Sequence, residues 1–184
     1  MRKLTVAVAL VTAAVALLTG TAGTAAAARP PVPAEHLAVR SWTSLNEHGS
    51  GANPGERLTA WVDARTVGDR TGGRAVVEHV FFGQGTVRVE FDVDCLTLDG
   101  GAVTVTGPVT TATATPVGRP ATTGPADWHP ETGLTFFPSD AHGEHRAGWA
   151  GADLSDPTRP ARATKCAPVP AGLWVIGGRT VAHQ

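Results

Sequence analysis

Three histidines in the second half of the chain are suited to bind a metal ion: His129, His142 and His145. Imidazole nitrogens are good ligands for Zn²⁺ and Cu²⁺ at neutral pH. His142 and His145 stand three residues apart on a predicted turn, so they could chelate one ion, with His129 reaching in from the preceding loop. The spacing does not match the His-Glu-x-x-His pattern of zinc proteases. We favour a solvated polar turn and retain a metal site as the alternative functional hypothesis.

Tryptophan is the other residue type that points to a ligand, because exposed indoles stack on sugar rings and on apolar molecules. The chain has five: Trp42, Trp61, Trp128, Trp149 and Trp174. In the alternating segment 58–65, Trp61 falls on the face opposite the aliphatic side chains, so it should point away from the core. We therefore predict a ligand site that involves Trp61, Trp128 and His129. The alternative is that the tryptophans serve packing and that the N-terminal segment covers Trp61.

The sequence contains no recognisable catalytic, phosphate-binding or calcium-binding motif. No serine lies in a Gly-x-Ser-x-Gly motif. Segment 83–85 (Gly-Gln-Gly) has strand patterns on both sides, whereas a phosphate-binding loop is followed by a helix. Asp153 and Asp156 lack the ligand spacing of an EF-hand, and Asp92 and Asp94 fit a charged outer strand face. The sequence thus favours a non-enzymatic protein over a hydrolase and predicts no cofactor.

Residues 1–28 have the three parts of a secretory signal peptide. An arginine and a lysine follow the first methionine, an apolar stretch covers residues 4–18, and small residues lead to an Ala-x-Ala site that ends at Ala28. The apolar stretch is shorter than the roughly 20 residues of a transmembrane helix. We expect the chain to be exported, cleaved after Ala28 and secreted, with no membrane insertion of the mature form.

The charge of the mature chain argues against nucleic acid and anionic membrane surfaces as partners. The whole chain has 15 Lys+Arg and 16 Asp+Glu, and removal of Arg2 and Lys3 with the signal leaves 13 against 16, or −3. A protein that follows a phosphate backbone needs an excess of positive charge. The expected partner is a small or surface-displayed extracellular ligand.

Cys95 and Cys166 are the only cysteines. An even number of cysteines in an oxidising compartment predicts a disulfide, and two cysteines allow one intramolecular pairing. The alternative, a catalytic thiol or a metal ligand, has less support because no Cys-x-x-Cys spacing occurs.

Alternating polarity predicts strands along the mature chain. The clearest case has Val87, Val89, Phe91 and Val93 on one face and charged residues on the other, as in an antiparallel strand with one solvated side. Residues 99–101 (Asp-Gly-Gly) predict a tight hairpin turn. No stretch of the mature chain shows the periodicity of a helix.

We therefore predict an all-β fold: a single-domain antiparallel β barrel or barrel-like sandwich of about eight strands with one disulfide. Residues 29–56 are expected to form an extended, partly disordered N-terminal segment that could include a short strand at 35–44. The β domain should then cover residues 57–184. Within it, Gly177 and Gly178 suggest a bulge or a bend at a barrel corner.

Several motifs of the chain resemble those of a group of small exported proteins. They are 93–107, in which a strand ends in Cys-Leu and the next ends in Thr-Gly, then 127–130 (Asp-Trp-His-Pro), 146–150 (Arg-Ala-Gly-Trp-Ala) and 165–168 (Lys-Cys-Ala-Pro). The pattern is similar to actinobacterial, Streptomyces-type secreted β proteins that are often labelled "repetin". The resemblance covers about residues 57–182. It implies export, a β domain and a Cys95–Cys166 bridge, but no activity and no catalytic residue.

Overall fold

The computed structural model describes residues 36–47 and 55–184. The expected signal peptide, residues 1–28, lies outside the described residues. The described residues form strands and no helix, so none of their segments is a helix that could cross a membrane. The strands are β1 (Ala38–Asn46), β2 (Glu56–Val67), β3 (Arg70–Phe81), β4 (Gly85–Asp92), β5 (Cys95–Asp99), β6 (Ala102–Pro116), β7 (Thr122–Thr123), β8 (Glu131–Phe136), β9 (Arg146–Ala150) and β10 (Leu173–His183).

Eight of these strands close into an antiparallel barrel. Their order around the barrel is β4-β3-β2-β1-β10-β9-β8-β6, and the pairing of β4 with β6 closes the ring. The two remaining strands, β5 and β7, each pair with β6 and lie outside this ring. The all-β barrel that the sequence predicts is therefore confirmed.

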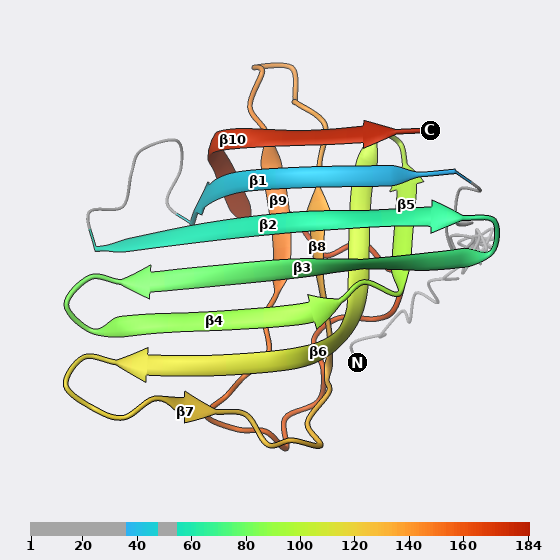
Figure 1. Cartoon of the computed structure of the whole chain (residues 1–184). Coiled ribbons are helices and arrows are strands. Elements are labelled where there is room, and N and C mark those ends of the chain that lie inside the picture. Colours follow the sequence, from blue (N-terminus) through green and yellow to red (C-terminus); the bar gives the residue numbers. More distant parts are fainter. Residues whose placement is uncertain (1–35, 48–54) are drawn as a thin grey trace, which may run out of the picture.

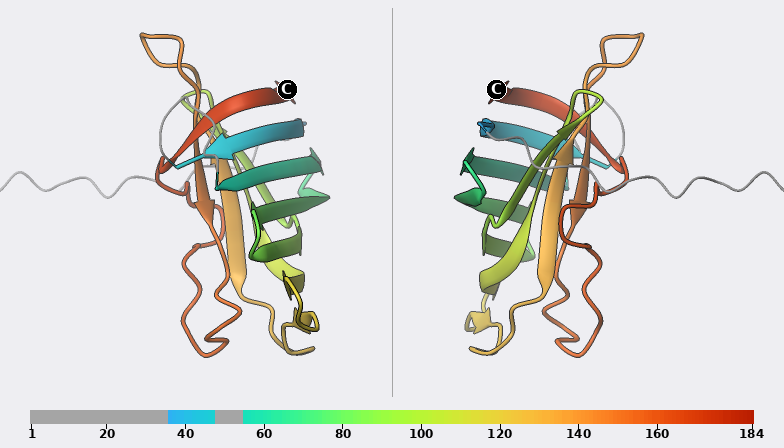
Figure 2. Two further views of the ribbon diagram at one scale, coloured as in Figure 1. Left: turned by 90° about the vertical axis from the view of Figure 1, so that its left-hand side faces the viewer. Right: turned by 90° about the vertical axis from the view of Figure 1, so that its right-hand side faces the viewer.

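The barrel is flattened into two layers whose strands cross (Figures 1 and 2). One layer contains β10, β1, β2, β3, β4 and the second half of β6, and the other contains β9, β8, β5 and the first half of β6. The long strand β6 belongs to both layers, since it pairs with β8 up to Pro108 and with β4 from Val109 onwards. Strand β10 likewise pairs with β9 at Leu173 and Trp174 and then continues along β1.

The bend of β10 coincides with a β-bulge. Ser44 of β1 is opposite Gly177, but Leu45 is opposite Val175, so Ile176 is the extra residue on β10. A bulge increases the local bend of a strand. The corner that the sequence predicts near Gly177 is thus confirmed.

Apolar side chains fill the space between the two layers. In and after β4, Val89, Phe91 and Val93 are buried, as their alternation predicts. The main core joins residues of both layers, among them Phe91, Leu96, Val105 and Leu134. Val87, which the same alternation places on this face, is only partly buried, and so are Trp149 and Val175, which pack against the main core.

Strand β1 lies in the middle of the first layer, between β10 and β2. The segment 29–56, which the sequence separates from the β domain, thus includes a barrel strand. Its inward side chains are two aliphatic and two hydroxyl residues, all buried: Val39, Ser41, Thr43 and Leu45. The hydroxyl of Ser41 lies 2.8 Å from that of Thr180 on β10, a hydrogen bond that makes its burial tolerable. Because hydroxyl groups interrupt the apolar alternation, the sequence shows this strand only weakly.

Residues 165–170, here named the covering segment, lie over the outer face of the second layer. The Cys166 amide donates a hydrogen bond to Thr106 Oγ1 at 3.0 Å, and the Val169 amide donates one to Thr135 Oγ1 at 2.8 Å. Both threonines are completely buried. This outer face is therefore closed by the chain itself.

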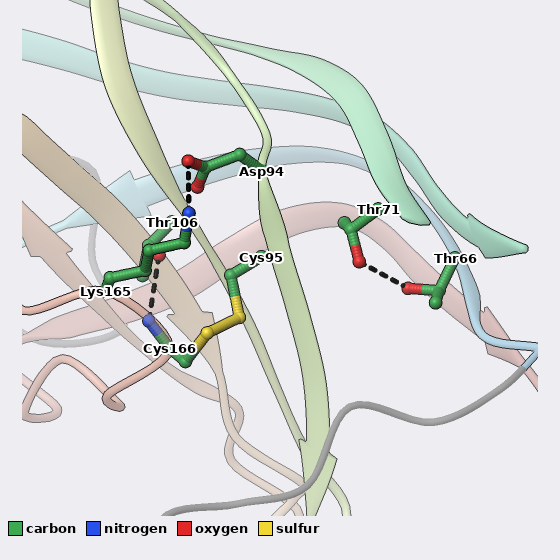
Figure 3. The surroundings of a disulfide bond; sticks show 7 residues. All are labelled: Thr66, Thr71, Asp94, Cys95, Thr106, Lys165 and Cys166. Atoms are coloured by element: carbon green, nitrogen blue, oxygen red, sulfur yellow. Dashed lines mark hydrogen bonds and ion pairs between the residues drawn. A yellow bond between two sulfur atoms is a disulfide. The ribbon is translucent and has the colours of Figure 1, made fainter. Parts of the chain in front are cut away.

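A covalent bond and an ion pair add to the attachment of the covering segment (Figure 3). The expected Cys95–Cys166 disulfide is present and joins it to β5. The Lys165 ammonium lies 2.6 Å from a carboxylate oxygen of Asp94, and this hydrogen bond raises the pKa of Lys165 above its ordinary value. Both contacts join residues 71 positions apart in the sequence.

Gly107 lies where β6 passes from one layer to the other. A β-carbon at this position would collide with the backbone carbonyl of Asp92, the last residue of β4. We expect Gly107→Ala to lower the free energy of unfolding by about 1–3 kcal/mol, the usual range for overpacking, as measured by urea unfolding. Gly72→Ala is the control, because a β-carbon there meets open space. Equal losses in the two variants would contradict a steric role for Gly107.

Candidate ligand-binding face

The outer face of the first layer carries two exposed tryptophans side by side. Trp42 of β1 and Trp61 of β2 are directly opposite each other in the strand register. Trp42 is 59% exposed and Trp61 is 41% exposed. Ala60 and Val62, the neighbours of Trp61 along β2, are buried, which confirms the predicted outward orientation of this indole. The two rings thus form one aromatic platform on the barrel surface.

Trp42 and Trp61 lie in an open groove with a volume of about 1270 Å³. The groove extends across β10, β1, β2 and β3, towards the end of the layer where β2 turns into β3. Two exposed or half-exposed valines, Val67 and Val181, add to its apolar lining. This volume is somewhat above the range of about 300–1,000 Å³ that is usual for small-molecule sites, so the groove can hold a ligand of more than one ring.

The charged residues that line the groove are mostly arginines. They are Arg40, Arg65, Arg70, Arg74 and Arg179, with Asp63 as the one carboxylate among the lining residues that the structure describes. The Arg40 Nε atom lies 3.4 Å from a carboxylate oxygen of Asp63, and Arg74 forms an ion pair with Glu90 of β4. The groove therefore combines indole faces with guanidinium groups.

Trp128 and His129, which the sequence associates with Trp61, lie elsewhere. The indole of Trp128 packs against a small second core that includes Val89 and Val109, and its Nε1 donates a hydrogen bond to the carbonyl of Pro157 at 3.0 Å. The Nδ1 atom of His129 lies 2.7 Å from the carbonyl of Val109. Trp128 thus has a packing role that accounts for its position, and the structure does not bring either residue into the groove.

The three histidines of the metal hypothesis are not brought together either. His129 precedes β8, whereas His142 and His145 follow it, so the six residues of β8 separate them by about 20 Å. Among the described residues, no three His, Cys, Asp or Glu side chains are grouped as a metal site would need. The alternative three-histidine site is therefore not assembled, because His129 lies at the opposite end of β8 from His142 and His145.

Asp140 organises the turn that carries His142. Its carboxylate accepts hydrogen bonds from the backbone amides of Glu144 at 3.0 Å and His142 at 2.8 Å. These two bonds stabilise the charged form and lower the pKa of Asp140 below its ordinary value. The polar residues of this turn thus support its backbone, in line with the solvated turn that the sequence favours.

Sequence reasoning did not select Trp42 or the arginines as site residues. Trp42 was visible as a tryptophan, but its place depends on β1 being a central strand and on the register that sets it opposite Trp61. The arginines come from the first three strands, β1, β2 and β3, and from the last strand, β10, which the fold brings beside β1. Alternation shows which face a side chain occupies, but not which strand lies beside it.

No protein-family model matches the chain, and no curated protein and no solved structure matches it.

Proposed function

We propose that the chain is an exported, non-enzymatic binding module that holds an extracellular ligand in the groove around Trp42 and Trp61. The observation that carries this proposal is the pair of exposed indoles, set directly opposite each other on neighbouring strands. Tryptophan is on average a highly buried residue, so two adjacent exposed indoles are unusual for a surface without a function. The disulfide and the signal-like N-terminus support an extracellular place of action.

The platform suits a ligand with flat apolar faces. Neighbouring strands are about 4.8 Å apart, so the two indoles offer adjacent stacking surfaces. Sugar rings present such faces and are common on extracellular surfaces that an exported protein meets. We therefore place carbohydrate first among the ligand classes.

The charged residues of the groove favour binding over catalysis. Sugar hydrolysis generally uses two carboxyl groups that face the scissile bond. Among the described lining residues only Asp63 is acidic, and it is engaged by Arg40 at 3.4 Å. The groove thus offers groups that hold a ligand rather than a pair that cleaves it.

Native gels cast with soluble polysaccharides test this proposal. We expect the mature protein to be retarded by at least one of hydroxyethyl cellulose, xylan, glycol chitin and polygalacturonate. Trp42→Ala and Trp61→Ala should each weaken binding about 30-fold, the effect of losing a well-placed aromatic contact, without lowering the Tm. Phe82→Ala is the control, since Phe82 is 52% exposed and lies outside the groove.

Two results would contradict the proposal. The first is migration of the wild type unchanged in all four gels. The second is unfolding of Trp61→Ala, which would show that this indole serves packing.

A further inference from the structure

The groove is strongly positive although the chain as a whole is not. Five guanidinium groups and one carboxylate give its lining a formal charge of +4 with His183 neutral, whereas the whole chain has a formal charge of −1. The arginines come from β1, β2, β3 and β10, so the fold gathers them on one face. Concentrated positive charge in a groove attracts an anionic ligand.

The arginines flank the aromatic platform on two sides. Arg179 of β10 is opposite Trp42 in the register, which places it beside the platform in the same row. Arg40 precedes Trp42 by two residues on the same face of β1, and Arg74 lies in the row of Arg40. Residues i and i+2 of a strand are about 6.7 Å apart. A ligand that stacks on the indoles therefore lies within reach of guanidinium groups.

Three of the five groove arginines are available to pair with a carboxylate of a ligand. Arg40 and Arg74 have carboxylate partners on the sheet, Asp63 and Glu90. For Arg65, Arg70 and Arg179, no ion pair occurs within residues 36–47 and 55–184. A guanidinium group binds a carboxylate through two parallel hydrogen bonds, which gives both affinity and orientation.

We infer that the ligand of this groove is an anionic polysaccharide, a chain of sugar rings that carry carboxylate groups. This inference rests on the proposed function and specifies its ligand class. The ring faces stack on Trp42 and Trp61, while the carboxylates accept hydrogen bonds from Arg179 and Arg65. The indoles and the arginines thus contact different parts of the sugar units, the ring faces and the carboxylate groups.

Other anionic ligands would fit the combination of indoles and arginines less completely. An acidic peptide would engage the arginines but would leave the indole faces without ring partners. A single-stranded nucleic acid needs a basic track that follows many phosphates. The positive area instead ends at β4, where Glu90 and Asp92 are opposite Val76 and Arg74.

Isothermal titration of the mature protein with two matched probes tests the inference. Polygalacturonate and its methyl ester have the same rings, but the ester lacks the negative charges. We expect polygalacturonate to bind at least about tenfold more tightly in dilute buffer, as for hydrogen bonds to charged groups. Raising NaCl to about 0.5 M should remove most of this preference, because salt screens exposed charges.

A double variant tests the arginines directly. Arg65→Gln combined with Arg179→Gln should weaken polygalacturonate binding at least about tenfold and weaken binding of the methyl ester by a much smaller factor. Arg119→Gln is the matched control for each of the two single variants, because Arg119 is exposed and lies outside the groove, and its replacement changes the net charge by the same single unit. Equal effects of the control and of each single variant would overturn a specific role of the groove arginines.

The remaining outcomes separate this inference from the proposed function. Equal, Trp61-dependent binding of both probes would overturn the anionic ligand and leave the binding module standing. Equal or tighter binding of polyglutamate or of oligothymidylate would overturn the polysaccharide in favour of another polyanion. Failure to bind polygalacturonate overturns the inference, and retention by a neutral polysaccharide in the gels then decides whether the proposed function survives.

Discussion

Replacing Cys95 and Cys166 together by alanine should lower the free energy of unfolding by about 4 kcal/mol. The disulfide closes a loop between residues 71 positions apart, and the loss of its constraint on the unfolded chain accounts for this magnitude. The native stability of small domains is about 5–15 kcal/mol, so a large fraction would be lost. Urea unfolding of the oxidised wild type and of the variant measures the difference.

The covering segment provides an independent readout of the same change. In the double variant the Val169 amide, which donates to Thr135, should exchange its hydrogen with solvent faster than in the wild type. Reduced wild type is the control and should match the double variant in both measurements. A loss of stability below about 1 kcal/mol would contradict the prediction and show that the hydrogen bonds of the segment suffice without the disulfide.

The cysteine pair was predictable from the sequence, but the place of the covering segment was not. Two cysteines in an exported chain predict one bridge. The backbone hydrogen bonds to Thr106 and Thr135 depend on these threonines sharing the outer face of the second layer with Cys95. The residues of that face include polar threonines, so the sequence does not predict their burial. They are buried because the covering segment crosses the face.

Local patterns predicted the alternating strand around Val89 and Phe91 and the hairpin that follows it, because each depends on a few adjacent residues. The hairpin at Gly100 and Gly101 is an example: both glycines have positive φ values, 56° and 83°, as a tight two-residue hairpin requires. Barrel closure is different, since it depends on β6 pairing with β8 along one half and with β4 along the other. No local pattern contains that information.

The candidate site likewise combines one feature that local sequence predicts with others that depend on strand pairing. The outward direction of Trp61 follows from the alternation of β2 and was predictable. Its pairing with Trp42, and the approach of Arg179 from β10, depend on the register of three strands. The functional surface therefore appeared only when the strands were placed side by side.

Phe91→Ala should lower the free energy of unfolding by about 3–5 kcal/mol, the range for truncating a buried phenylalanine. Phe91 is completely buried in the main core, and its ring centroid lies 6.4 Å from that of Trp149 on the opposite layer. Truncation removes contacts between the two layers and leaves a cavity at their interface. Urea unfolding measures the stability, and near-ultraviolet circular dichroism reports the changed surroundings of Trp149.

Phe82→Ala makes the same chemical change at a position that is 52% exposed, so it should alter stability by less than about 0.5 kcal/mol. The contrast between the two variants tests the layer packing itself. If both variants lost a similar small amount, Phe91 would not hold the layers together, and the core would have to depend on its aliphatic residues. If Phe91→Ala folds, the groove on the outer face of β1 and β2 should still bind its polysaccharide ligand. Phe91 faces the interior, and its truncation leaves Trp42 and Trp61 in register.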